Sequence, residues 1–264
     1  MTATNAAEGL LLELGVSEPE DLDLEAIAWH VGVKVNYRRL DGCEARIIGR
    51  GDRAIVTVHE GLHERRKRFS LGHELGHWYH HRGKSFICRP EDIGSERQNV
   101  PVAEREADRY AADLLMPWFL FRPLARQAKT ASFDLAKQLA DRFQTSLTAT
   151  SIRLVDANVF PMILVCHGNE GRRWFKRSKD VPERWFPQNQ LDADSYAFDI
   201  LFGSRSEHRP VKMGAETWFD RGEAGRYELL EQTIKISGDE VLTMLLLTDG
   251  EMLEERETRG RTWR

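Results

Sequence analysis

The sequence predicts an α+β fold, and three observations support this prediction. Short segments with strand-like alternation precede a helical pattern that contains His-Glu-x-x-His at residues 73–77. Two further helical patterns between residues 132 and 157 form a helix-turn-helix-like arrangement. After Pro161 the pattern becomes rich in strands. We therefore expect a small antiparallel sheet plus helices, then a helical domain, then a β-rich domain, over residues 1–128, 129–158 and 159–264.

The first domain begins with two short helices and three strands. Leu10, Leu11 and Leu14 share one face of a helix predicted over residues 5–15, and an Asp cap begins a second helix that reaches His30. Period-two alternation then predicts strands at residues 31–37, 45–48 and 54–58. These strands indicate an antiparallel sheet just upstream of the motif helix.

The motif helix is predicted over residues 62–81. Its buried stripe consists of Leu71, Leu75 and Trp78, which follow one another at helical spacing. The basic run at residues 65–68 is interpreted as the solvated face of this helix in preference to a binding patch. The two histidines of the motif fall on a neighbouring stripe of the same helix.

Two segments follow the motif helix. Residues 82–101 show little periodicity, and a loop of this length in a compact domain is disordered or functional. Because it joins the motif helix to the next one, we expect it to border a cleft. The next helix is predicted over residues 102–115, and its small residues Ala107 and Ala111 permit close packing on the motif helix.

The remainder of the chain predicts a helix pair and then strands. Leu135, Leu139 and Phe143 form one helical stripe, and Ser146 can cap a second helix. Strands are expected at residues 162–166, 227–236 and 241–247. Three Trp-Phe pairs are interpreted as core residues of the β-rich domain, with a ligand-sensing pocket as the alternative, at residues 174–175, 185–186 and 218–219.

Composition excludes several classes of protein. No stretch approaches the roughly 20 apolar residues of a membrane span, and the N-terminal residues lack the pattern of a signal peptide. Three distant cysteines do not form a disulfide framework. We therefore expect a cytoplasmic protein with no membrane partner. The net charge of −4 and a second helix with Arg153 as its one cation disfavour direct nucleic-acid binding.

The His-Glu-x-x-His motif indicates a zinc site of the zincin type. His73 and His77 lie one helical turn apart, so both imidazoles can bind one zinc ion. Glu74 lies between them and can act as the general base toward a water molecule. Two imidazoles alone leave the ion short of one protein ligand, which must come from elsewhere in the chain.

Glu104 on the next helix is the candidate for the third ligand. Glu106 is the alternative, but residues two apart on a helix point about 200° apart, so only one can face the metal. Asp108 shares the helix face of Glu104 and can accept the free N–H of a ligand histidine. The sequence therefore predicts His73, His77 and Glu104 as zinc ligands.

Other polar residues near the motif have open roles. His80, His81, Tyr79 or Tyr110 could stabilise an oxyanion, although a solvated helix end is the simpler interpretation. Cys88 could cap the zinc as a thiolate, but a free thiol is the favoured interpretation.

The chain resembles the ImmA/IrrE family of zinc metallopeptidases. The resemblance rests on the motif at residues 73–77, on Glu104-Arg-Glu-Ala-Asp-Arg-Tyr-Ala-Ala-Asp-Leu-Leu-Met-Pro117 and on residues 135–154. The family usually has Asn and Phe where this chain has Asp108 and Tyr110. The resemblance covers about residues 20–158 and implies a third, C-terminal domain similar to GAF sensor folds.

The resemblance also implies a function. Members of this family cleave a helix-turn-helix repressor and so turn on silent genes of a mobile element or of the DNA-damage response. We expect a cytoplasmic zinc endopeptidase of this kind with Glu74 as its base. A zinc-stabilised regulator that binds a repressor or antitoxin without cutting it, and a DNA-binding transcription factor, are the alternatives.

Overall fold

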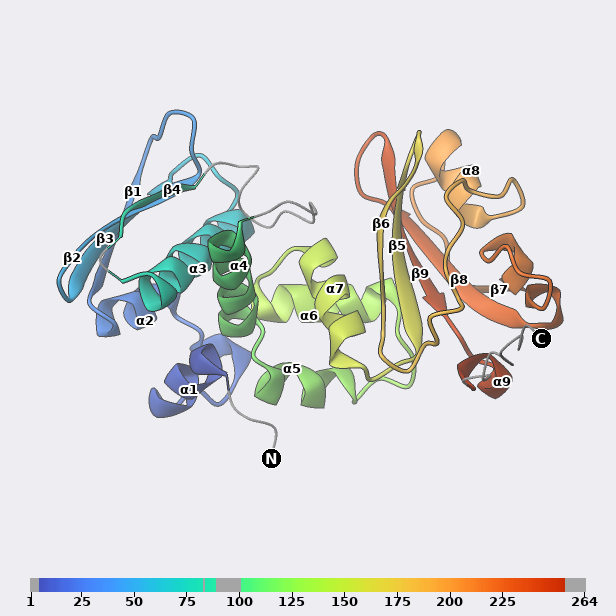
Figure 1. Ribbon diagram of the computed structural model, residues 1–264, viewed down its shortest axis with the longest axis horizontal. Coiled ribbons are helices and arrows are strands. Elements are labelled where there is room, and N and C mark those ends of the chain that lie inside the picture. The colour runs from blue at the N-terminus through green and yellow to red at the C-terminus, as the bar shows by residue number, and fades with distance from the viewer. Residues whose placement is uncertain (1–4, 83, 89–100, 255–264) are drawn as a thin grey trace, which may run out of the picture. The chain divides into compact units, whose positions relative to one another are not determined.

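The computed structural model describes residues 5–82, 84–88 and 101–254, and it has an α+β fold as predicted (Figure 1). The chain divides into two compact units. The first contains residues 1–127 and 137–150, and the second contains residues 128–136 and 151–264. The division therefore passes through helices α6 (Phe133–Phe143) and α7 (Leu147–Ala157). The predicted boundaries at residues 128 and 158 stay predictions.

The first unit contains a four-stranded sheet in the order β1-β3-β2-β4. Its strands are β1 (Val33–Arg38), β2 (Ala45–Arg50), β3 (Arg53–His59) and β4 (Phe86–Cys88). A tight turn at Gly51, with φ +62°, joins β2 to β3 as an antiparallel pair.

This sheet is mixed, whereas the sequence predicted an antiparallel one. β2 is antiparallel to β3 and β4, but β1 runs parallel to β3. The tight turn gives one edge of β3 to β2. β1 pairs with the other edge of β3 in the parallel direction, so β3 separates it from β2.

Strand β4 lies inside the segment predicted as an irregular loop. Three residues are too few to show a period-two pattern, which explains why the sequence did not predict the strand. Phe86 pairs with Ile47, and Cys88 pairs with Ala45. The greater part of the predicted loop, residues 89–100, lies outside the described residues.

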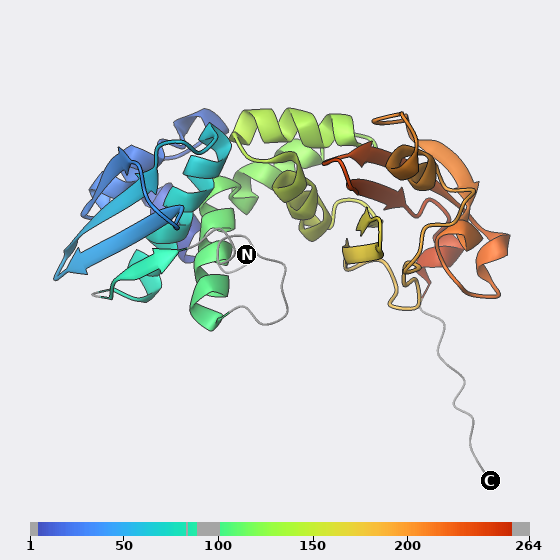
Figure 2. The same cartoon turned by 90° about the horizontal axis from the view of Figure 1, so that it is seen from above.

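Two helices carry the motif residues, and their limits agree with the prediction. They are α3 (Glu64–His80) and α4 (Val102–Leu115). Leu71, Leu75 and Trp78 of α3 are each 2% exposed, so they form the predicted buried stripe. α3 packs against β2 and β3, and α4 lies beside it in both views (Figures 1 and 2).

Three shorter helices complete this part of the chain. They are α1 (Ala6–Glu13), α2 (Leu24–His30) and α5 (Trp118–Ala125). Asp23 caps α2 by accepting from the backbone N–H groups of Glu25 and Ala26.

The basic run at the start of α3 is not a freely solvated face. Arg66 pairs with Glu44 at 2.7 Å, and its side chain is 34% exposed. Arg68 donates to the backbone carbonyl of Leu22 at 3.2 Å. These contacts connect α3 to neighbouring segments, so the prediction of a solvated face was wrong in part.

The helix pair α6 and α7 is joined by a short turn. Gln144 has a positive φ of 54°, and Thr145 follows as a buried residue. The Ser146 hydroxyl accepts from the backbone N–H of Ala149 at 3.1 Å, as the predicted cap requires.

The second unit contains a five-stranded antiparallel sheet in the order β6-β5-β9-β8-β7. Its strands are β5 (Met162–Gly168), β6 (Gly171–Arg177), β7 (Val211–Gly214), β8 (Glu228–Lys235) and β9 (Glu240–Leu246). The predicted strands correspond to β5, β8 and β9, while β6 and β7 were not predicted. Helices α8 (Tyr196–Phe202) and α9 (Gly250–Leu253) accompany the sheet.

The Trp-Phe pairs of this unit are core residues only in part. Trp185, Trp218 and Phe219 are at most 2% exposed and belong to its hydrophobic core. Phe186, however, is 54% exposed. In neither unit does a helix of the described residues combine the length and the apolar character needed to cross a membrane.

Candidate metal centre

Helix α3 places the two histidines of the motif beside each other in the interior. His73 and His77 are at most 1% exposed. Their Nε2 atoms lie 3.0 Å apart, and their ring centroids lie 4.7 Å apart. Because Leu71 and Leu75 anchor the adjacent stripe, the helix presents both imidazoles toward α4.

Helix α4 adds a carboxylate to the two imidazoles. Glu104 Oε2 lies 3.0 Å from His73 Nε2 and 3.3 Å from His77 Nε2. Gly76 permits this close approach, since a Cβ there would lie 2.7 Å from Ala107 Cα. The structure thus brings together the three residues that the sequence predicted as ligands.

Two further acidic residues of α4 differ in their distance from the two histidines. Asp108 Oδ1 lies 2.8 Å from His73 Nδ1, where it can accept the N–H and hold Nε2 toward the other donors. Glu106 lies 3.5 Å from His81 Nε2 and is about half exposed. The geometry therefore favours Glu104 over Glu106 as the third ligand.

The charges of the cluster are strongly coupled. Burial opposes the charged form of His73, but the hydrogen bonds with Asp108 and Glu104 outweigh it and raise the pKa of His73 to about 9. Burial likewise opposes the charged form of Glu104, but its hydrogen bonds to His73 and His77 hold its pKa at about 2. Without a metal ion, a protonated imidazole can serve as the cation that the carboxylates attract.

Glu74 lies on the same helix and is completely buried. Neither of its carboxylate oxygens makes a well-formed hydrogen bond within the described residues, although the Cys88 thiol lies close enough to interact with the carboxylate. Burial raises the pKa of Glu74 to about 7, although the nearby charge of His73 and the Cys88 thiol both favour the carboxylate. A buried carboxyl group with this pKa suits a general base near neutral pH.

These donors fit a divalent metal ion. Two imidazoles and a carboxylate are the ligand set of many catalytic zinc sites, which keep a fourth position open. A buried carboxylate without a well-formed hydrogen bond is costly unless something else interacts with it. Glu74 is such a group, so the chemistry of the site agrees with a bound ion and its water.

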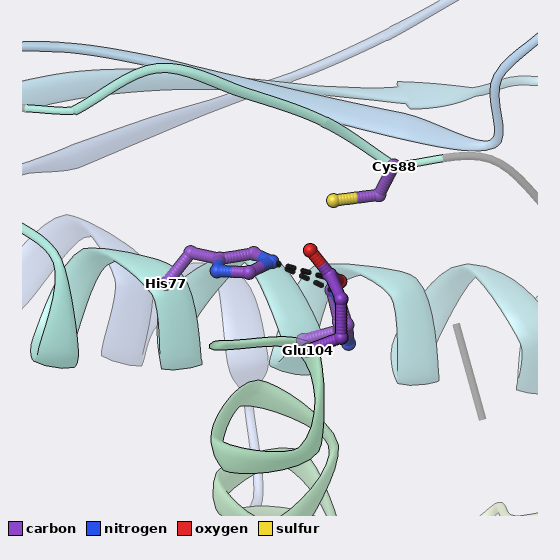
Figure 3. A group of neighbouring side chains, drawn as sticks. His77, Cys88 and Glu104 are labelled. Carbon is purple, nitrogen blue, oxygen red and sulfur yellow. Dashed lines mark hydrogen bonds and ion pairs between the residues drawn. The ribbon is translucent and has the colours of Figure 1, made fainter. Parts of the chain in front are cut away.

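Cys88 is the residue that sequence reasoning undervalued. A ligand atom of Cys88 and those of His73, His77 and Glu104 all lie within 4.8 Å of one another. In Figure 3 the Cys88 side chain points from its strand toward the Glu104 carboxylate. No spacing signal in the sequence could connect Cys88 to the motif, because strand β4 alone determines its place.

The residues weighed for oxyanion stabilisation lie at the end of α3. The rings of Tyr79 and Tyr110 stack on each other at 5.2 Å, and burial raises the pKa of Tyr110 to about 12. The ring centroid of His81 lies 5.6 Å from that of His77, and burial lowers the pKa of His81. Which of these groups faces a substrate stays a prediction.

The second helix of the helix-turn-helix-like pair offers little to DNA. Arg153 is 6% exposed, so its guanidinium lies in the interior. A phosphate contact needs a cation on the surface. That the helix pair does not bind DNA directly stays a prediction.

Comparisons with known proteins agree with this description. The model of the Peptidase M78 family, described as the IrrE N-terminal-like domain, matches residues 28–155. A Mycobacterium tuberculosis transcriptional regulator has a similar fold, with a TM-score of 0.57 and 15% identity over 98% of this chain and 92% of that chain. None of the curated proteins matches the chain significantly. The matched segment includes both metal-site helices, while the structural likeness shows the fold alone.

Proposed function

We propose that this chain is a zinc-dependent endopeptidase, because residues 28–155 match the model of the IrrE N-terminal-like domain of the Peptidase M78 family. Its substrate is a helix-turn-helix transcriptional repressor, whose cleavage derepresses the genes that it silences. The observation that carries the proposal is the buried carboxylate of Glu74 beside the converging donors of His73, His77 and Glu104.

The donor set supports zinc as the metal. His73, His77 and Glu104 would hold the ion, and Asp108 would keep the His73 imidazole in the tautomer that presents Nε2. Zinc bound in this way supplies a Lewis acid that acidifies water and polarises a peptide carbonyl.

Glu74 performs the proton transfers in this proposal. Its carboxylate accepts a proton from the attacking water and then donates it to the leaving amine. Burial raises the pKa of Glu74 and so favours the protonated form that donates to the amine. The burial of Glu74 keeps bulk water from competing for its carboxylate oxygens.

The choice of substrate rests on the family resemblance. The structural similarity to a transcriptional regulator supports a role in the control of gene expression. The burial of Arg153 supports action on a regulator protein in preference to DNA.

The experiment compares the wild-type protein with Glu74→Gln, using a panel of purified helix-turn-helix repressors as substrates. The variant keeps the size of the side chain but removes the base. We expect specific cleavage by the wild-type protein and a loss of several orders of magnitude in the variant, with zinc content unchanged. Casein serves as the control and should stay intact. Near-normal cleavage by Glu74→Gln would remove the proposed mechanism, and comparable digestion of casein would remove the proposed specificity.

A further inference from the structure

We propose that Cys88 is a fourth zinc ligand, whose reversibly bound thiolate occupies the catalytic position in most molecules and so keeps the peptidase largely latent. The inference deepens the proposed function, and the latency of the peptidase rests on that function. The ligand assignment itself rests on the geometry of the described side chains.

The positions of the donor atoms support a four-ligand site. Donors bound at about 2.0–2.3 Å to a tetrahedral zinc ion lie roughly 3.3–3.8 Å from one another. The ligand atoms of His73, His77, Cys88 and Glu104 already lie within 4.8 Å of one another. Shifts on the order of 1 Å would therefore complete the tetrahedron.

Strand β4 fixes Cys88 over the site. Residues 86 and 88 point to the same face of the strand, whereas Ile87 points away and is 69% exposed. The Phe86 ring stacks on the His77 imidazole at 4.0 Å, and the Cys88 carbonyl accepts from the Glu44 backbone N–H at 3.1 Å. The thiol is thus held against α3 by the sheet (Figure 3).

The surroundings of Cys88 are those of a ligand and not of a packed apolar thiol. The side chain is 1% exposed, yet its neighbours are two imidazoles and the carboxylate of Glu104. A second observation points to a ligand here: neither carboxylate oxygen of the fully buried Glu74 makes a well-formed hydrogen bond within the described residues. The positive charge of a metal ion beside it would offset the cost of burying this carboxylate.

The chemistry of the closed site is simple. The Cys88 thiol loses its proton to solvent and its sulfur forms a bond to zinc, with no transfer of electrons between redox states. While the thiolate is bound, two histidines, one glutamate and one thiolate would fill the four positions that zinc prefers, so no position would remain for water. Glu74 then has no water to deprotonate. An electrophile that alkylates the sulfur forms a C–S bond, expels its leaving group and opens the position.

The ligand assignment is tested by X-ray absorption at the zinc edge on the full-length, zinc-loaded protein under reducing conditions. We expect one sulfur at about 2.3 Å together with nitrogen and oxygen donors. Cys88→Ser should lose the sulfur signal, while Cys43→Ser and Cys166→Ser, the matched controls, should keep it. A shell of nitrogen and oxygen only in the wild-type protein, or a sulfur signal that persists in Cys88→Ser, would overturn the assignment.

Latency is tested separately by cleavage of purified helix-turn-helix repressors. We expect Cys88→Ser to cleave at least tenfold faster than the wild-type protein, and iodoacetamide to activate the wild type but not Cys88→Ser. A sulfur signal with no such activation would overturn latency. Cleavage by a wild-type protein without zinc–sulfur bonding would sink this inference alone, whereas zinc–sulfur bonding without cleavage by any variant would sink the proposed function alone.

Discussion

At the scale of single residues, the imidazole of His73 depends on the carboxylate behind it. Asp108 Oδ1 lies 2.8 Å from His73 Nδ1, so its negative charge strengthens the donor character of Nε2. Asp108→Asn keeps the size of the side chain and removes this charge. We predict a 10–100-fold weaker zinc affinity, of the order found for such partners, measured by competition with a chromogenic chelator.

The matched control for that variant is Glu106→Gln on the same helix. Glu106 lies beside His81 and is about half exposed. The substitution therefore also removes one negative charge from α4, but at a position that does not contact the ligands. Its zinc affinity should equal that of the wild-type protein. An Asp108→Asn protein with wild-type affinity would show that Asp108 does not support the ligand.

At the scale of elements, the metal site depends on the close packing of α3 on α4. A Cβ at Gly76 would lie 2.7 Å from Ala107 Cα and 2.9 Å from the Ala107 carbonyl oxygen. Gly76→Ala must therefore separate the two helices that carry the ligands. We predict about 1–3 kcal/mol lower stability and weaker zinc binding, measured by urea unfolding and by chelator competition.

Gly9→Ala in α1 is the control for this prediction. No atom lies within 4 Å of the position that its Cβ would occupy, and alanine favours a helix over glycine by roughly 0.5–1 kcal/mol. This variant should be as stable as the wild-type protein or more so. Equal effects of the two substitutions would contradict the role given to the helix contact.

Strand β5 of the second unit carries a buried histidine that should make stability depend on pH. Burial lowers the pKa of His167 to about 4, against about 6.5 in an unfolded chain. Between these values the unfolded state binds more protons, so the stability contributed by His167 is present above about pH 6.5 and is lost as pH falls. We predict a loss of about 2 kcal/mol from this residue between pH 7 and pH 5.

His167→Gln isolates this contribution because glutamine does not titrate. Urea unfolding of both proteins at the two pH values should show the smaller acid-induced loss in the variant. An equal loss in the two proteins would mean that His167 does not set the acid sensitivity.

The elements that the sequence predicted best are those with long, regular patterns. Helices α3 and α4 place Leu71, Leu75 and Ala107 at helical spacing, so their limits and three predicted ligands could be derived without coordinates. Strand β4 has three residues and gives no pattern. Cys88 came into the site only through its pairing with Ala45, which is a tertiary contact.

The parallel pairing of β1 could not be predicted from the sequence either, because it is also a tertiary contact. Alternation shows that a segment is a strand, but it does not show which neighbour the strand chooses. In the second unit, β6 mixes the bulky Trp174 and Phe175 with basic residues and has no clear apolar face. Its pairing with β5 decides its conformation.

At the scale of the whole molecule, all proposed ligands belong to the first compact unit. We predict that a chain shortened to residues 1–158 still binds zinc and changes only in control or in capture of substrate. The division of the units passes through α6 and α7, so this chain keeps pieces of the second unit without its sheet. The test measures the zinc content and the thermal unfolding of the shortened chain. Its His77→Ala variant shows how much zinc binds without the metal site. An insoluble or metal-free protein would contradict the predicted separation.

The most direct test of the metal centre is elemental analysis of purified wild-type, Glu104→Ala and Glu106→Ala proteins. We expect about one zinc ion per chain in the wild-type protein and in Glu106→Ala, and a clearly lower zinc content in Glu104→Ala, because Glu104 Oε2 lies 3.0 Å from His73 Nε2 while Glu106 lies beside His81. Full zinc in Glu104→Ala together with its loss from Glu106→Ala would contradict the proposed metal centre.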